Sequence, residues 1–364
     1  MRAEGPDNSS VPEPRRRSGQ KSRRFAAGCG CVAAALGVLA WFLSREPQLT
    51  DHAARVTNVT NYAWIDDHQL LWAIPASSHL SRINLLTHEQ RRIESIDALA
   101  DAKTWNGVDI RAVAPGGNHA LASIARLEDE WRSLLRTRNH GLIDLAGRLT
   151  RELDAGESAV WLPDGRRWLS LGPINPDDYW DSSNPSLPAL WLRSADAPHR
   201  KVGPIAAPKS VKALLGVTPD YRVVMTDLPP GIDEPSVTIL QQGVFPSNAP
   251  EQKATLPAPA GWFYRDAALS PDGNRIAWLQ TSAHMPPLIA FLRGFLPAMV
   301  KNFTVTRRYR ILTSLVDGTD IREIGFQNAD KANSGVSHLK WNPDGKRLSF
   351  VFGDSLYIVP AGSK

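Results

Sequence analysis

The sequence predicts an all-β fold, a six-bladed β-propeller preceded by one N-terminal transmembrane helix. Three observations predict it. A tight turn followed by a short apolar strand recurs six times along the chain. A second short apolar strand follows the first in every repeat. Before the repeats, residues 25–43 contain no charged side chain, and the residues that precede them are rich in Arg and Lys.

The clearest turn unit is LSPDGNRIAWLQ, at residues 269–280. Pro271 fixes its own φ, Asp272 can accept hydrogen bonds from backbone amides two residues on, and Gly273 adopts a positive φ without a steric clash. The apolar run that follows is rich in strand-forming residues and too short for a helix. The segment therefore predicts a turn that opens a buried strand.

Five further segments share this pattern to different degrees. They are WIDDHQLLWAI at 64–74, VAPGGNHALASIA at 113–125, WLPDGRRWLSL at 161–171, VTPDYRVVMTD at 217–227 and WNPDGKRLSFVF at 341–352. Successive units are separated by 49, 48, 56, 52 and 72 residues. These intervals are counted between turn positions that we take as equivalent: Asp67, Gly116, Asp164, Asp220, Asp272 and Asp344. Three of the segments, at 64–74, 113–125 and 217–227, diverge from the Pro-Asp-Gly pattern. The last of them, for example, has Tyr221 in place of Gly.

The second strand of each repeat supports the same division of the chain. These strands are SRINLL, HGLIDL, PALWLR, SVTILQ, YRILTSL and DSLYIV, which begin at residues 81, 140, 188, 236, 309 and 354. Repeats of roughly 40 to 50 residues with four short strands are typical of propeller blades. A β-sandwich, the alternative, does not require turns at a near-constant interval.

The Pro-Asp-Gly turns and the strands that they open resemble the TolB-type propeller repeat, over about residues 62–360. This resemblance implies a six-bladed propeller and protein–protein interaction at the cell envelope. It does not identify the partner, because propellers carry unrelated functions. Four tryptophans lie on or beside the turn strands, and we expect them to pack in the core: Trp64, Trp161, Trp278 and Trp341.

The N-terminal region predicts where the propeller is located. Residues 1–24 are polar and charged, which predicts a disordered tail. Residues 25–43 have about the length of a membrane-spanning helix, and residues 44–53 then form a linker. Six cations precede the segment, whereas only Arg45 closely follows it. The positive-inside rule therefore predicts a single-pass inner-membrane protein with a cytoplasmic N-terminus and a periplasmic propeller at 54–364.

The alternative interpretation of residues 25–43 is a cleaved signal peptide that ends at the small-residue site Val38–Ala40. Trp41, Phe42 and Leu43 continue the apolar run beyond that site, which favours an uncleaved anchor. Both cysteines, Cys29 and Cys31, lie in this segment, so the propeller is predicted to fold without disulfides. The tail holds seven Lys or Arg and three Asp or Glu, hence four of the five net positive charges.

The remaining chain is nearly neutral, so we expect no nucleic-acid binding, which requires a clustered basic face. The sequence contains no recognisable catalytic, metal-binding or phosphate-binding motif. We therefore expect no cofactor and no catalytic residues, and we expect the repeated Asp residues to form turns. The predicted function is a protein-binding or scaffold module of the envelope. The alternative is an envelope hydrolase or lactonase-like enzyme with a site in the central channel.

One repeat is longer than the others by roughly 20 residues, and the excess coincides with the apolar stretch HMPPLIAFLRGFLPAMVKNF at 284–303. Helical spacing aligns five of its side chains, which are the candidate partner-binding residues: Leu288, Phe291, Leu292, Phe295 and Met299. A large exposed apolar face usually marks a contact with a partner or a membrane surface. The alternative is a helix that folds against the propeller rim.

The last unit ends too soon to supply its own outer strand. The β-branched, alternating segment ARVTNVTNY at 54–62 precedes the first turn unit and can supply it. We therefore predict that Arg55–Thr60 pairs with the strand around Leu356–Val359, which would close the ring by backbone hydrogen bonds.

Overall fold

The computed structural model describes residues 47–59, 61–73, 80–93, 105–126, 138–145, 149–153, 158–173, 188–196, 202–229, 231–244, 251–284, 306–329 and 335–362. The predicted tail, the uncharged segment 25–43 and the five candidate partner-binding residues between 288 and 299 lie outside these ranges. Among the described residues, no helix is long and apolar enough to cross a membrane.

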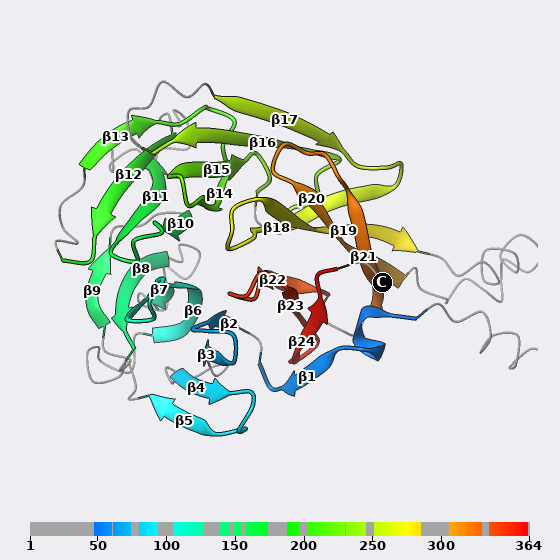
Figure 1. The fold of residues 1–364 in the computed structure, drawn as a ribbon, viewed down its shortest axis with the longest axis horizontal. Helices are drawn as coiled ribbons and strands as arrows, with labels where there is room; N and C mark the ends of the chain where they lie inside the picture. The colour runs from blue at the N-terminus through cyan, green and yellow to red at the C-terminus, as the bar shows by residue number, and fades with distance from the viewer. Residues whose placement is uncertain are drawn as a thin grey trace, which may run out of the picture. The chain divides into compact units, whose positions relative to one another are not determined.

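Six antiparallel sheets of four strands each make up the described part of the chain, and Figure 1 shows them arranged in a ring. Blade one contains β2 (Tyr62–Trp64), β3 (Gln69–Ala73), β4 (Leu80–Asn84) and β5 (Gln90–Ile93). Blade two contains β6 (Trp105–Val113), β7 (His119–Arg126), β8 (Arg138–Asp144) and β9 (Leu149–Leu153). Blade three contains β10 (Ser158–Trp161), β11 (Arg167–Pro173), β12 (Pro188–Ser194) and β13 (Val202–Ala206).

The remaining blades follow the same order from the inner to the outer strand. Blade four contains β14 (Ala213–Val217), β15 (Arg222–Thr226), β16 (Ser236–Gly243) and β17 (Gln252–Pro257). Blade five contains β18 (Trp262–Leu269), β19 (Arg275–His284), β20 (Thr306–Leu315) and β21 (Arg322–Ala329). Blade six contains β22 (Ser337–Trp341), β23 (Arg347–Phe352), β24 (Ser355–Pro360) and, as its outer strand, β1 (Ala54–Thr57). The predicted six-bladed propeller is thus confirmed.

The repeated sequence pattern forms the turn between the first and second strands of the blades. The position of Gly in the Pro-Asp-Gly turn has a left-handed φ in five blades, at Gly117 (77°), Gly165 (63°), Tyr221 (60°), Gly273 (73°) and Gly345 (67°). The divergent unit of blade four therefore keeps the turn geometry even though a non-glycine residue is disfavoured there. At Asp164, one carboxylate oxygen accepts the amides of Arg166 and Arg167 at 2.9 Å each, which is the predicted role of the Asp as a turn former.

These turns contact one another around one face of the ring, which we call the turn face. A Cβ atom on Gly165 would lie 2.0 Å from the carbonyl oxygen of Pro115, in the turn of the preceding blade. Gly273 approaches Thr218 in the same way, and Arg347 donates from Nη2 to the carbonyl oxygen of Asp67 at 3.1 Å. The repeated turn therefore packs neighbouring blades together in addition to reversing the chain.

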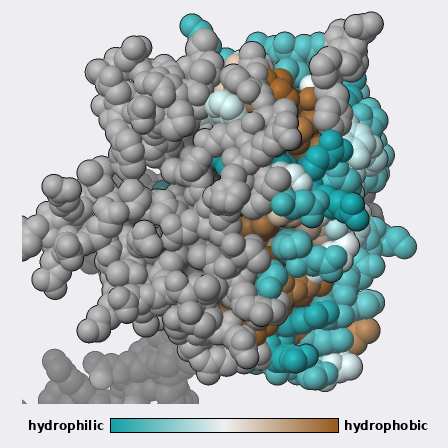
Figure 2. Space-filling view, turned by 90° about the vertical axis from the view of Figure 1, so that its left-hand side faces the viewer, coloured by the Kyte–Doolittle hydropathy of each residue, from teal (hydrophilic) through white to brown (hydrophobic). Residues whose placement is uncertain are grey.

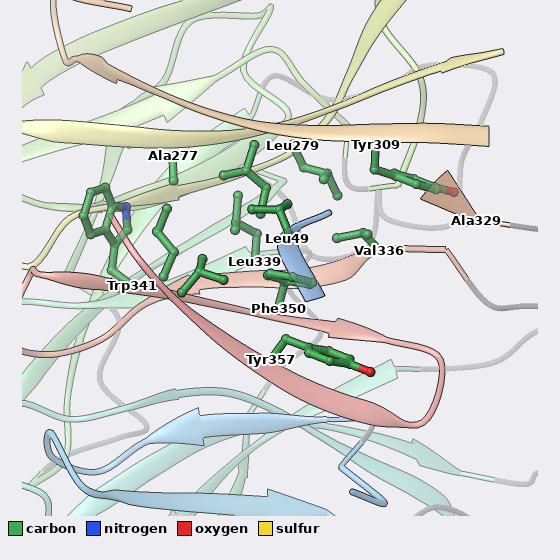
Figure 3. Close-up of a cluster of buried hydrophobic side chains, with 13 residues drawn as sticks. Leu49, Ala277, Leu279, Tyr309, Ala329, Val336, Leu339, Trp341, Phe350 and Tyr357 are labelled. Carbon is green, nitrogen blue, oxygen red and sulfur yellow. The ribbon is translucent and has the colours of Figure 1, made fainter. Parts of the chain in front are cut away.

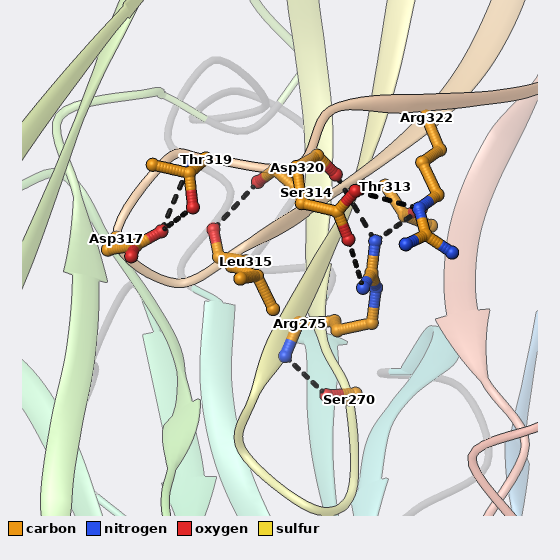
Figure 4. Close-up of polar contacts among 9 residues, drawn as sticks. All are labelled: Ser270, Arg275, Thr313, Ser314, Leu315, Asp317, Thr319, Asp320 and Arg322. Carbon is orange, nitrogen blue, oxygen red and sulfur yellow. Dashed lines mark hydrogen bonds and ion pairs between the residues drawn. The ribbon is translucent and has the colours of Figure 1, made fainter.

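Blade five has a second turn on this face, and polar side chains connect it to the first (Figure 4). Arg275 Nη1 lies 2.9 Å from one carboxylate oxygen of Asp320, and Arg322 Nε lies 2.8 Å from the other. Asp317 accepts the backbone amide and the hydroxyl of Thr319 at 2.9 Å and 2.6 Å. Exposed ion pairs of this kind contribute little each, about 0–1 kcal/mol, so they order the turn more than they stabilise the fold.

The tryptophans that were predicted to pack in the core are buried, with exposed fractions between 1 and 7 %. Three of them also donate a hydrogen bond to the preceding blade. Trp64 donates to Ser349 Oγ at 2.9 Å, Trp161 to the carbonyl of Ala112 at 3.4 Å, and Trp341 to the carbonyl of Ala268 at 3.0 Å. Each indole thus buries a large apolar surface while its N–H group finds a partner.

The predicted closure of the ring is confirmed. Strand β1 pairs antiparallel with β24, with Ala54 opposite Ile358, Val56 opposite Leu356 and Thr57 opposite Ser355. The pairing covers Ala54–Thr57, since the chain turns at Asn58, which has a φ of 62°. Backbone hydrogen bonds between the two ends of the chain therefore hold blade six together.

The residues immediately before β1 also contact the ring, although the sequence analysis placed them in the linker. Residues Leu49–Asp51 form a 3-10 helix, and Leu49 inserts between blades five and six beside Tyr309, Leu339 and Phe350 (Figure 3). Gln48 Oε1 accepts from Gln327 Nε2 at 2.6 Å. The structured unit begins at Gln48, and all six clusters of buried apolar side chains lie within Gln48–Lys364.

Removal of residues 1–47 is therefore expected to leave the thermal melt of the propeller unchanged. Removal of residues 1–57 should destabilise it by more than about 3 kcal/mol, because it deletes β1 and exposes the site of Leu49, and a buried Leu contributes about 1.5–3 kcal/mol. Circular dichroism melts of the two truncated chains test this. Equal melting temperatures for both would contradict the role of β1 in closure.

The packing between turns gives a second expectation, from two glycines with similar φ. Gly345→Ala should cost about 1–2 kcal/mol, because the left-handed φ is strained for alanine but the nearest atom to the new Cβ would be Pro271 Cδ at 4.0 Å. Gly165→Ala adds a clash with a backbone oxygen and should cost about 2–5 kcal/mol. Urea unfolding of the two variants compares them directly, and equal losses would show that the turns do not pack closely.

Candidate functional site: the central channel

A cavity of about 490 Å³ lies along the central channel, and the inner strands of blades two to six line it. Most of the residues that line it are apolar. Five side chains that can carry charge interrupt this wall: Arg111 on β6, Arg265 and Asp266 on β18, and His338 and Lys340 on β22. These residues are the chemically distinctive part of the channel.

A hydrogen bond between neighbouring blades recurs at three junctions of the ring. In the even blades, β6, β14 and β22 each contain a β-bulge close to the same position. An amide at each bulge donates to a side chain of the preceding odd blade: Ile110 N to Asn61 Oδ1 at 3.0 Å, Leu214 N to Ser158 Oγ at 3.1 Å, and Leu339 N to Asp266 Oδ2 at 3.3 Å. Each of these side chains therefore gives an amide beside a bulge an acceptor in the neighbouring blade.

Lys340 connects three blades across the channel. Its ammonium donates to the carbonyl oxygen of Tyr62 in blade one, and to those of Ile110 at 3.3 Å and Arg111 at 3.2 Å in blade two. The ammonium has three donors, and these three contacts use them. The side chain therefore acts as an internal cation that holds blades six, one and two in position, beside the junction that β1 closes.

A buried polar network contacts the backbone of Lys340. Tyr62 Oη is 2.7 Å from Ser349 Oγ and 3.0 Å from the carbonyl oxygen of His338. Ser349 in turn donates to the carbonyl of Lys340 at 3.2 Å. Burial raises the pKa of Tyr62 far above its ordinary value, so the phenol stays protonated and can donate. His338 has a φ of 53°, an uncommon conformation for a non-glycine residue, at the bulge of β22.

Asp266 is the one carboxylate among the described residues that line the cavity. It accepts the amides of Ala267 at 2.9 Å and Leu339 at 3.3 Å. Burial raises the pKa of its carboxyl, and the two amides and the charges of Lys340 and Arg265 oppose that effect only in part. Arg265 itself forms an ion pair with Asp233 at 2.9 Å. The lining thus contains the cations Lys340 and Arg265, which are held by their own partners, and the carboxyl of Asp266, whose pKa is raised.

This arrangement explains the channel as a structural element more fully than as a reactive centre. The described residues contain no cluster of three or more His, Cys, Asp or Glu side chains that could hold a metal ion. The predicted turn residues Asp164, Asp272 and Asp344 lie in their turns on the turn face and not in the lining of the cavity. Leu288, Phe291, Leu292, Phe295 and Met299, proposed from the sequence as partner-binding residues, lie outside the described residues.

The sequence analysis did not identify Asp266 or Lys340. The available signal was weak: Asp266 and Lys340 each lie close before a repeated turn, in a short inner strand that also contains Arg265 or His338. The equivalent positions of the other blades contain no Asp and no Lys, so the repeat pattern predicts no common role for these two residues. Their roles depend on contacts with other blades, which only the closed ring creates.

No model of a known protein family matches the sequence, and no curated protein sequence is significantly similar to it. Solved propeller structures are similar in fold. The putative TolB from Agrobacterium tumefaciens is 13 % identical, with a TM-score of 0.46 over 83 % of this chain and 90 % of that chain.

Two other solved structures show the same level of similarity. The C-terminal WD40 domain of Sif2 is 11 % identical, with a TM-score of 0.44 over 87 % of this chain and 98 % of that chain. A gluconolactonase from Xanthomonas campestris is 12 % identical, with a TM-score of 0.44 over 86 % of this chain and 90 % of that chain. Similarities this distant carry no argument about what the chain binds or catalyses.

The raised pKa of Asp266 predicts a distinctive pH dependence of stability. Above about pH 4 the unfolded chain loses this proton while the folded chain retains it, so folding becomes less favourable as the pH rises through the folded pKa. Asp266→Asn cannot ionise. The melting temperature of the variant, relative to that of the native chain, should therefore increase between about pH 4 and pH 8.

Asp164→Asn is the matched control with the opposite sign. Burial of Asp164 is outweighed by hydrogen bonds from Arg166 and Arg167, which lower the pKa of its carboxyl. This carboxylate stabilises the fold above its unfolded pKa of about 4, so the control variant should lose stability there and the difference should vanish in acid. Parallel pH slopes for the two variants would contradict the assignment of Asp266.

Proposed function

We propose that this chain is a membrane-anchored envelope propeller that binds a protein partner through the insertion of blade five. The observation that carries the proposal is the pairing of β19 with β20. These strands pair over their whole length, from Arg275 opposite Leu315 to His284 opposite Thr306. Blade five already has its four strands, so the residues between His284 and Thr306 are not needed to build the sheet.

The composition of the insertion supports a binding role. Leu288, Phe291, Leu292, Phe295 and Met299 share one side if the segment is helical. Aromatic residues and Met are enriched at protein interfaces, where they fill apolar pockets of the partner. Because the rest of the ring is closed by its own strands, an added apolar segment is best explained by a contact outside the propeller.

The location at the inner membrane is a further part of the proposal. It rests on the uncharged residues 25–43, on the six cations before them, and on the positive-inside rule. The described part of the chain contains no cysteine, which suits an oxidising compartment because no free thiol is exposed there. In this arrangement the tail is cytoplasmic and the propeller periplasmic.

The topology is tested by fusing reporters to the C-terminus, one active only in the periplasm and one active only in the cytoplasm. We expect activity from the periplasmic reporter alone, because the cations hold the N-terminus inside. Activity of the cytoplasmic reporter would refute the location.

Partner binding is tested by replacing Phe291, Phe295 and Met299 together with Ser, followed by purification from solubilised membranes. We expect the variant to melt like the native chain and to lose the partner. The matched control replaces three apolar residues exposed on the described propeller: Leu86, Ile232 and Ile321. An unchanged yield of partner with the insertion variant, or loss of its cooperative melt, would contradict the proposal.

A further inference from the structure

The central channel has a cation near the entrance that lies away from the repeated turns. Strand β18 ends at Leu269, directly before the turn of blade five, so its first residues lie toward the face opposite the turn face. Arg265 lies in the first half of β18 and lines the cavity, as does Gly231 from the connection between β15 and β16. The lining continues from these residues to Pro271 on the turn face.

The guanidinium of Arg265 is held on one side and uses few of its donors. Its Nη1 donates to Asp233 Oδ1 at 2.9 Å, and 28 % of its side chain is exposed. Among the described residues, Asp233 is the only hydrogen-bond acceptor of this side chain, although a guanidinium has five N–H donors. Nε and Nη2 thus remain as a parallel pair of donors, which is the pair that a carboxylate accepts.

An apolar side chain is exposed beside this entrance. The segment before β16 runs along the start of β18, since Glu234 and Tyr264 exchange backbone hydrogen bonds at 2.8 Å and 2.7 Å. Ile232 lies between Gly231 and Asp233, both of which bond to Arg265, and it is 54 % exposed. The side of the ring in Figure 2, by contrast, presents mainly hydrophilic side chains among the described residues.

The channel beyond Arg265 contains an apolar space of molecular size. Its volume of about 490 Å³ lies within the range of small-molecule pockets, about 300–1,000 Å³. The apolar residues that line it include Val160, Leu214, Leu215, Leu228, Leu279 and Val336. A ligand that fills this space is therefore expected to be largely apolar, with a polar group that reaches the entrance.

Two carboxyl groups near Arg265 oppose the binding of an anion only weakly. Asp233 already pairs with Arg265, and 34 % of its side chain is exposed, so water screens its charge. Burial raises the pKa of Asp266, so a smaller fraction of this carboxyl is ionised at a given pH. Lys340 contributes a further cation to the lining. The entrance therefore favours a negatively charged group.

We propose that the central channel binds a small monocarboxylic acid, with the carboxylate on Arg265 and the apolar body inside the cavity. Nε and Nη2 of Arg265 donate to the two carboxylate oxygens, and the ion pair with Asp233 orients the guanidinium before the ligand arrives. This site is separate from the insertion of blade five, and it depends neither on that insertion nor on the membrane anchor.

The C-terminus of a polypeptide offers the same carboxylate, but the position of the apolar wall favours a free acid. A polypeptide enters a channel with its C-terminus first, so a carboxylate stopped at Arg265 would leave the apolar side chains outside the cavity. A free acid can place its body in the cavity and leave its carboxylate at the entrance.

Calorimetric titration of the full chain in detergent with hexanoate tests the proposal, with titration into the same detergent as the blank. We expect hexanoate to bind at one site per chain. Acetate lacks most of the apolar body and hexanamide lacks the charge, so each should bind at least about tenfold more weakly. Equal binding of hexanoate and acetate, or of hexanoate and hexanamide, would overturn the inference.

Two variants that break the same exposed ion pair should have opposite effects. Arg265→Gln should weaken hexanoate binding at least about tenfold, because it removes both donors to the carboxylate. Asp233→Asn should strengthen binding by up to about fivefold, because it removes a carboxylate that competes for the guanidinium. Loss of binding in both variants would show that the pair only supports the local fold, and would overturn the assignment of Arg265.

Lys346→Gln removes an exposed cation on the turn face and is the matched control, which should bind hexanoate like the native chain. A peptide that ends in leucine distinguishes the other source of a carboxylate. Binding of that peptide without binding of hexanoate would overturn the proposal and assign Arg265 to a polypeptide C-terminus, and binding of neither would overturn it as well. Loss of the partner in the insertion variant leaves hexanoate binding unchanged, so the two proposals fail independently.

Discussion

The backbone pairing of β1 with β24 is the constraint on which the rest of the structure depends. A propeller has no chain connection between its first and last blades, so the two ends must be joined by noncovalent contacts. Here four residues of β1 complete blade six, and Leu49 fills the space between blades five and six. The described propeller contains no cysteine, so packing and hydrogen bonding perform the role that a disulfide could perform elsewhere.

Side chains in the channel also join neighbouring blades by hydrogen bonds. Asn61, Ser158 and Asp266 each accept an amide of the next blade, and Lys340 reaches carbonyl oxygens of two further blades. The contacts of Lys340, Tyr62 and Ser349 concentrate at the junction between blades six and one. This is the junction that chain connectivity does not hold, and a buried polar network lies there. A satisfied buried network specifies one arrangement, because each misplaced group would lose its partner.

Local chemistry made the blades predictable from the sequence. Pro-Asp-Gly turns require particular φ values, and the strands show apolar patterns that are visible in one sequence. The six units, and an outer strand within residues 54–62, could therefore be inferred. The channel residues could not be inferred, because Asp266 and Lys340 act on amides and carbonyls that lie 70 or more positions away in the sequence. Leu49 was assigned to a linker for the same reason: one buried Leu gives no periodic signal.

The closure of the ring and the proposed attachment to a membrane use the same stretch of chain. Gln48, Leu49 and β1 follow directly after the region that would leave the bilayer, and they contact blades five and six. A force applied through the N-terminus would therefore act first on the part of the ring that this stretch closes. The contacts of Gln48 and Leu49 with blade five lie before β1 in the chain, so they would carry that load before the β1–β24 ladder does. In the proposed attachment, the docked segment would therefore protect the β1–β24 ladder.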